Sequence, residues 1–106
     1  MYAAIIFAIM AGRPAVLEYR GNLGLPYDPR FAAVISFDEA ERRIRKGKPP
    51  VLFAMPGGPV VRGTNKEALN LIIEWQAAKD DDDEKSMKTA LKRAGKQARM
   101  RKFRAR

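Results

Sequence analysis

The sequence predicts a small α+β domain with three to five strands, two helices packed on the sheet, and a basic C-terminal helix or tail. Short apolar runs between glycine- and proline-rich turns predict the strands, and apolar residues spaced three and four apart predict the helices. The end of the chain differs from the rest because it contains basic residues and no acidic ones. We expect a compact domain at 1–79, an acidic linker at 80–84 and a basic helical or disordered tail at 85–106.

The first strand is expected within residues 2–10, where every residue is apolar. This run is too short to cross a bilayer, which takes roughly 20 residues. No lysine or arginine precedes it, so we interpret it as a buried strand and not as a targeting segment. Residues 11–14, Ala-Gly-Arg-Pro, are expected to form the hairpin loop that follows.

The second strand is expected at residues 15–20, where apolar and charged residues alternate from Leu17 onward. Leu17 and Tyr19 fall on one face, and Glu18 and Arg20 fall on the other. This period of two is typical of a half-buried strand.

A loop is expected at residues 21–30, since glycine, proline and asparagine recur through it. It also carries Leu23, Leu25 and Tyr27, which have two interpretations. They either fold back onto the core, which we favour, or form a contact site for a protein partner. A third strand is expected at residues 31–37.

The first helix has recognisable ends. Asp38 is expected to cap its first turn, with Glu41 completing a capping box. Gly47, as the left-handed residue, and Pro49, as a helix breaker, are expected to end it. The apolar side chains expected to face the sheet are Phe37, Ala40 and Ile44.

A fourth strand is expected at residues 50–55, and Val60–Val61 are expected to pair briefly beyond a Pro-Gly-Gly-Pro turn. Thr64 and Glu67 then form a second capping box, which opens a helix running to about Lys79. The residues expected to face the core from this helix are Ala68, Leu71, Ile72, Trp75 and Ala78.

The positive charge of the chain is concentrated at its end. The net charge is +9; residues 1–84 contain 11 basic and 12 acidic residues, which sum to −1, and residues 85–106 contribute +10. The tail is rich in helix-forming residues, but its apolar stripe is narrow and consists mostly of alanine. We therefore expect this helix to dock weakly on the body. The stripe consists of Met87, Leu91, Ala94 and Ala98.

Ten basic residues with no acidic residue among them predict that the tail contacts the phosphate backbone of nucleic acid and releases condensed counterions. The tail residues expected to do so are Lys85, Lys88, Lys92, Arg93, Lys96, Arg99, Arg101, Lys102, Arg104 and Arg106. A second basic cluster, in and just after the first helix, would extend this surface if it faced the same way. It consists of Arg42, Arg43, Arg45, Lys46 and Lys48.

Other functions fit the same features. The tail could be a solvated segment that binds acidic proteins, and the acidic run at 80–84 could either screen the tail or serve as a spacer. The alternative function is a small protein-binding regulator or inhibitor that docks on a larger machine through the 21–30 loop or a sheet edge. A structural subunit of a ribonucleoprotein or virion is a third option. DNA and RNA are not distinguished.

Few catalytic groups are available. The chain has no cysteine and no histidine, which excludes disulfides, thiolate nucleophiles and imidazole acid–base chemistry. Glu18, Asp28 and Glu74 are isolated acids. We expect a cytoplasmic non-enzyme with no catalytic residues, metal, cofactor, small-molecule substrate or membrane partner. A protein partner or homo-oligomer is compatible with so small a core.

Overall fold

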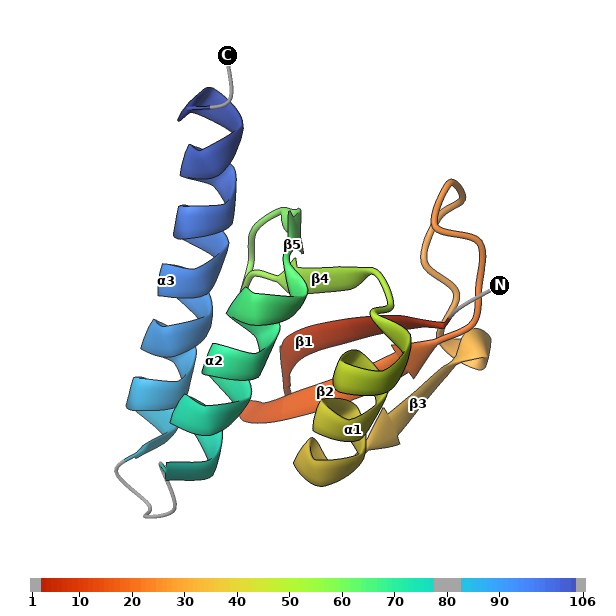
Figure 1. Ribbon diagram of the computed structural model, residues 1–106, viewed down its shortest axis with the longest axis horizontal. Helices are drawn as coiled ribbons and strands as arrows, with labels where there is room; N and C mark the ends of the chain where they lie inside the picture. Colours follow the sequence, from red (N-terminus) through yellow and green to blue (C-terminus); the bar gives the residue numbers. More distant parts are fainter. Residues whose placement is uncertain (1–2, 78–82, 105–106) are drawn as a thin grey trace.

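The computed structural model describes the backbone of residues 3–77 and 83–104 and the side chains of residues 3–77 and 87–100. This part of the chain forms a five-stranded sheet with three α-helices, so the predicted α+β class is confirmed (Figure 1). The elements in chain order are β1 (Ala4–Met10), β2 (Arg13–Tyr19), the 3₁₀ turn η1 (Pro29–Phe31), β3 (Ala32–Ile35), α1 (Phe37–Gly47), β4 (Val51–Ala54), β5 (Val60–Gly63), α2 (Asn65–Ala77) and α3 (Asp83–Arg104).

The strands lie in the order β3-β2-β1-β4-β5. β1 pairs antiparallel with β2 and parallel with β4, and the two outer pairs, β2–β3 and β4–β5, are antiparallel. A two-residue turn joins β1 to β2, with positive φ angles of 52° at Ala11 and 77° at Gly12. Both residues of such a turn need positive φ to match the twist of the strands. α1 carries the chain from β3 at one edge of the sheet to β4 beside β1.

The main core lies between the helices and one face of the sheet (Figure 1). Phe7 of β1 and Phe53 of β4 are fully buried there, and each ring centroid of this pair lies 5.7 Å from the other. Trp75 of α2 packs edge-on against Phe7, also at 5.7 Å. All three helices contribute buried residues to this cluster, including Ile44 of α1 and Leu91 of α3.

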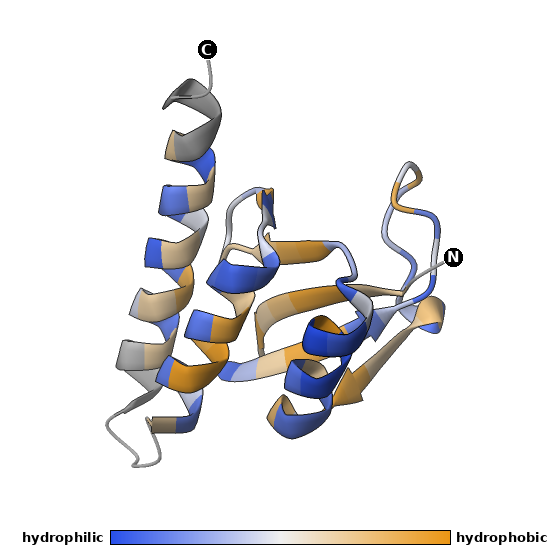
Figure 2. Cartoon of the chain, in the orientation of Figure 1, coloured by the Kyte–Doolittle hydropathy of each residue, from blue (hydrophilic) through white to orange (hydrophobic). Residues whose placement is uncertain are grey.

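The other face of the sheet has no helix over it in the described part of the chain. A second, smaller cluster lies on it, formed by Ala4, Ile6, Leu17 and Tyr19. Figure 2 shows β1 and β4 coloured as hydrophobic along their length, as expected of strands that are apolar on both faces. We call this surface the helix-free face.

The alternation of β2 agrees with expectation, but its buried apolar pair does not lie on the face that meets the main core. Leu17 and Tyr19 do share a face, but it is the helix-free face. Glu18 points to the helix side and is only 6% exposed. The alternation in the sequence identifies which residues lie together, and the position of α1 decides which of the two faces is covered by helices.

The ends of α1 also differ from expectation. The cap is Ser36 and not Asp38: the Ser36 hydroxyl accepts a hydrogen bond from the Glu39 backbone N–H at 3.0 Å. Starting two residues earlier puts Phe37 in the first turn, where its ring centroid lies 5.8 Å from that of Trp75. At the other end, the left-handed residue is Lys48, with φ 47°, and not Gly47.

The start of α2 agrees with expectation. The Thr64 backbone N–H donates to the Glu67 carboxylate at 2.8 Å, and the Glu67 N–H donates back to the Thr64 hydroxyl at 3.1 Å. This is the reciprocal pattern of a capping box. The expected inward residues that the structure describes are all buried: Ala68, Leu71, Ile72 and Trp75. Ala78 and Lys79 lie outside the described residues.

Candidate nucleic-acid interface

α3 is docked on the body, so the expectation of weak docking was wrong. Leu91 is fully buried and Ala98 is 2% exposed. Trp75 donates its indole N–H to the backbone carbonyl of Met87 at 3.0 Å, which ties α3 to α2. Gly95 is buried against Met55, and a Cβ at this position would collide with the Met55 sulfur. Small residues on the docked side of α3, such as Gly95 and Ala98, allow the backbone of this helix to lie close to the side chains of the body.

A glycine inside a helical pattern was the sequence signal for this contact. Gly95 is the one glycine of α3, and it faces the turn between β4 and β5. Sequence reasoning missed it, and it also missed Met55 as the residue that fills the space.

The docked side of α3 fixes which basic residues point outward. Lys92, Lys96 and Arg99 are exposed and lie at i, i+4 and i+7, which places them in a row along one side of the helix. Together with Met55 and Met100 they line a groove of about 450 Å³. We call these three cations the α3 basic row. At 1.5 Å per residue the row is about 10 Å long.

The basic row has no acidic partner among the residues whose side chains are described. Arg93, which follows Lys92 in the chain, does have a partner: its guanidinium lies 3.5 Å from the carboxylate of Glu74, and both side chains are exposed. Lys88, one turn before the row, is half-buried. The row therefore presents uncompensated positive charge to solvent.

Part of the predicted interface lies outside the residues that the structure describes. α3 begins at Asp83, inside the predicted acidic linker, and Asp80–Asp82 lie outside the described residues. The same holds for any contact between that acidic run and the tail. Also outside it are the side chains of Lys85, Arg101, Lys102 and Arg104 and the whole of Arg106.

The second basic cluster is arranged differently. Arg42 and Arg43 both pair with Glu39, and Arg45 donates to Glu41 at 3.0 Å. Each of these pairs joins residues one turn apart on α1, so carboxylates of the same helix neutralise much of the positive charge of the second basic cluster. Figure 1 shows α2 lying between α1 and α3, so the structure does not join this cluster to the α3 basic row. Lys46 and Lys48 are exposed.

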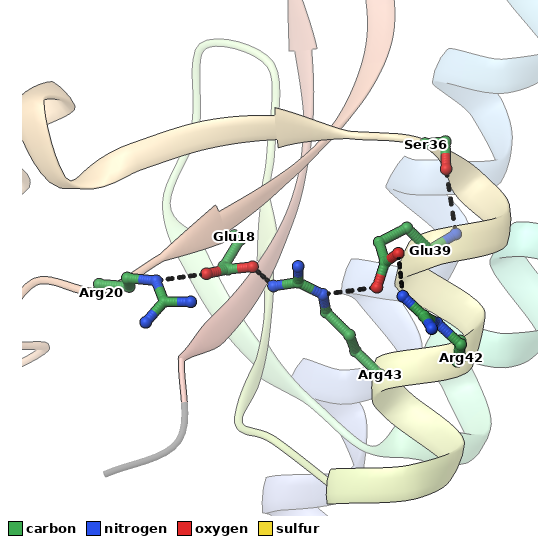
Figure 3. Close-up of polar contacts among 6 residues, drawn as sticks. All are labelled: Glu18, Arg20, Ser36, Glu39, Arg42 and Arg43. Atoms are coloured by element: carbon green, nitrogen blue, oxygen red, sulfur yellow. Dashed lines mark hydrogen bonds and ion pairs between the residues drawn. The ribbon is translucent and has the colours of Figure 1, made fainter.

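Glu18 is a buried carboxylate at the centre of an ionic cluster. Arg20 donates to its carboxylate at 2.5 Å, and Arg43 pairs with its other oxygen (Figure 3). Arg43 also donates to Glu39 at 2.9 Å, so it links β2 to the first turns of α1. A cavity of about 550 Å³, lined in part by Arg20, Arg43 and Lys46, lies beside the cluster. Two of these three cations are already engaged by Glu18.

We predict that Arg43→Met destabilises the protein by about 1–3 kcal/mol, because it leaves a buried carboxylate with one solvent-exposed partner. Urea unfolding followed by Trp75 fluorescence measures the loss. Arg45→Met is the matched control: its pair with Glu41 is exposed, so the change should stay within about 0.5 kcal/mol. Equal losses in the two variants would show that the Glu18 cluster does not stabilise the fold.

The 21–30 loop does not fold back onto the core, so the favoured interpretation of its apolar residues was wrong. Leu23, Leu25 and Tyr27 are 45%, 65% and 53% exposed. Tyr27 stacks on Tyr19 at 5.1 Å, and the Asp28 backbone N–H donates to the Tyr19 hydroxyl at 3.1 Å. These contacts hold the loop at the border of the helix-free face, where its apolar side chains and the strands line a groove of about 510 Å³.

The end of this loop is held by an ion pair. Arg30 donates to both carboxylate oxygens of Asp28, and these hydrogen bonds lower the pKa of the Asp28 carboxyl below its usual value. Asp28 also accepts from the Arg30 backbone N–H at 3.0 Å and caps η1. With Glu18 and Glu74, all three isolated acids of the sequence pair with arginines.

No helix in the described part of the chain is long and apolar enough to cross a membrane. Within that part, no group of three or more aspartate or glutamate side chains is placed to hold a metal ion.

Comparisons with protein-family models, curated protein sequences and solved structures found no match to this chain. What the site can do is therefore inferred from its geometry and charge.

Proposed function

We propose that this protein is a non-catalytic nucleic-acid-associated protein whose helix α3 contacts the phosphate backbone of DNA or RNA. The observation that supports this is the α3 basic row, three exposed cations on one side of a docked helix with no acidic partner among the described residues. A groove beside the row gives a backbone room to lie against it.

Docking strengthens the proposal, because it holds the cations in place. A free polycation loses conformational entropy when it is ordered on a ligand. Leu91, Gly95 and Ala98 hold α3 against the body, so the spacing of Lys92, Lys96 and Arg99 is set before binding. This part of the interface is preorganised, which reduces the entropic cost of association.

The contacts are to phosphate and carry no base specificity. Lysine and arginine bind phosphate oxygens through charge-assisted hydrogen bonds, and such contacts position a protein without reading sequence. Arg99 adds a forked donor that fits two phosphate oxygens. We expect little preference among duplexes of different sequence.

The test is the salt dependence of binding. For about four phosphate contacts, from the row and Lys88, the logarithm of the association constant should fall with the logarithm of salt concentration with a slope near −3.6. Contacts by further tail cations would steepen it. Fluorescence anisotropy of labelled duplex DNA and of an RNA stem, titrated at several salt concentrations, measures the slope. A flat response, or no binding to either probe at low salt, would reject the proposal.

The second candidate is a protein-binding regulator that docks through the 21–30 loop. The exposure of Leu23, Leu25 and Tyr27 favours it, since large apolar side chains gathered on a surface are typical of interaction sites. The loop and α3 lie at opposite ends of the molecule in Figure 1, so the two roles do not compete for one surface.

A further inference from the structure

The helix-free face is more apolar than the solvent-exposed face of a typical antiparallel sheet, which carries alternating polar residues. Every residue of β1 and of β4 is apolar, a pattern typical of strands covered on both faces. The three helices cover only the other face. The register places Val34 beside Leu17 and Val60 beside Ala54, on the uncovered side.

The exposed area of this face is large. Six apolar side chains of this face and of the adjoining 21–30 loop are between 45% and 68% exposed. Taking about 200 Å² for a large side chain that is fully exposed, they present roughly 600–700 Å². That exceeds the largest apolar patch of about 300–600 Å² on a typical monomer and approaches the about 800 Å² that each partner buries in a standard interface. The six are Met10, Leu23, Leu25, Tyr27, Val34 and Val60.

We propose that the helix-free face binds a second copy of this chain, forming a homodimer in which the two sheets pack face to face. The exposed side chains of this face are mostly apolar, and a second copy offers the same area of the same chemistry. Two sheets packed in this way lie about 10 Å apart, with their side chains interdigitated. The 21–30 loop of each copy would lie along the border of the partner's sheet.

The charge distribution allows this pairing. Arg13 at the start of β2 and Arg62 on edge strand β5 are the charged strand residues whose register places them on this face, so charge is confined to its rim. Residues 1–84 sum to −1, whereas the excess positive charge is on α3. Two sheets and a helix layer on each side separate the α3 helices by well over the Debye length, which is about 8 Å at physiological salt.

The groove of about 510 Å³ suits a second copy better than a small ligand. A small-molecule site usually contains a few polar groups that orient its ligand. Here the Tyr19 hydroxyl already accepts from the Asp28 N–H, and most of the other lining side chains are aliphatic. A ligand of that volume would also leave Val34, outside the groove, exposed. A second sheet would cover the groove and Val34 together.

The test is the oligomeric state of the full chain without nucleic acid. Sedimentation equilibrium should give twice the mass of one 11.9 kDa chain at micromolar concentrations. Val60→Glu and Val34→Glu should each raise the dimer dissociation constant by at least about 100-fold, because each dimer would bury two introduced carboxylates in an apolar interface. Ile73→Glu is the matched control, since Ile73 of α2 is 58% exposed on the helix side. It should leave the constant unchanged.

A second measurement covers the case in which a variant fails to fold. The chain has no cysteine, so Val60→Cys and Ile73→Cys each introduce a single thiol. Alkylation of Val60→Cys should be slow at high protein concentration and fast on dilution, and Ile73→Cys should react equally fast at both.

Several results would overturn the proposal. They are a single-chain mass across the concentration range, equal weakening by Ile73→Glu, dimers that survive both glutamate variants, and concentration-independent alkylation of Val60→Cys. The proposal does not depend on nucleic-acid binding. High salt should leave the dimer intact while weakening nucleic-acid binding, so failure of one is distinguishable from failure of the other.

Discussion

Residues 1–82, expressed without α3, are expected to lose cooperative folding. α3 contributes Ala90, Leu91 and Ala98 to the same buried cluster as Trp75. Its removal would expose the tryptophan ring and leave the indole N–H without the Met87 carbonyl as acceptor. Domains of this size have a total stability of about 5–15 kcal/mol, so losing a whole core helix exceeds what the body can tolerate. Urea titration of the truncated chain should show no sigmoidal transition and red-shifted tryptophan emission.

A single substitution tests the same packing without deleting the helix. Leu91→Ala should lower the free energy of unfolding by about 2–5 kcal/mol, because Leu91 is fully buried. The single tryptophan, Trp75, reports the transition. Lys92→Ala, at the adjacent exposed position, should change stability by less than about 0.5 kcal/mol. Equal effects at the two positions, or a truncated chain that unfolds cooperatively, would show that α3 is not part of the core.

Neutralising the α3 basic row is expected to weaken nucleic-acid binding on the order of 10²–10³-fold at about 0.1 M salt. The triple variant is Lys92→Gln, Lys96→Gln and Arg99→Gln. Each lost phosphate contact should reduce the magnitude of the salt slope by about 0.9, so the slope should fall by about 2.7. All three side chains are exposed, so Trp75 fluorescence and urea unfolding should match the unmodified protein. Substitution is preferable to truncation because α3 is expected to be needed for folding.

The matched control removes three positive charges from α1. Arg42→Gln, Arg45→Gln and Lys46→Gln give the same net charge as the row variant. Two of these residues are already paired with carboxylates of α1, so affinity should change by less than about threefold. If both triple variants lost affinity equally, binding would depend on net charge alone and the row would have no special role.

Features that depend on neighbours in sequence were predictable. The capping box of Thr64 and Glu67 and the buried side of α2 follow from residues three and four apart, and both agree with the structure. The order of strands and helices followed from the same local patterns. The start of α1 was harder, because both Ser36 and Asp38 are good caps. Packing of Phe37 on Trp75, far along the chain, accompanies the earlier start.

The candidate interface was predictable in composition and not in arrangement. The concentration of basic residues in the tail can be counted from the sequence. Whether each one is paired or exposed depends on where the carboxylates of other segments lie. Glu39 and Glu41 match part of the charge on α1, and no described carboxylate reaches Lys92 or Lys96.

By itself, the sequence determined the fold class, the positions of the elements and the separation of a near-neutral body from a cationic C-terminal segment. Only the tertiary structure decided that α3 docks, that Glu18 is buried among arginines and that one apolar face of the sheet has no helix over it. The physical reason is that helix spacing, caps and strand alternation arise between residues close in the chain. Burial of a face depends on which distant segment packs against it, as Met55 does against Gly95.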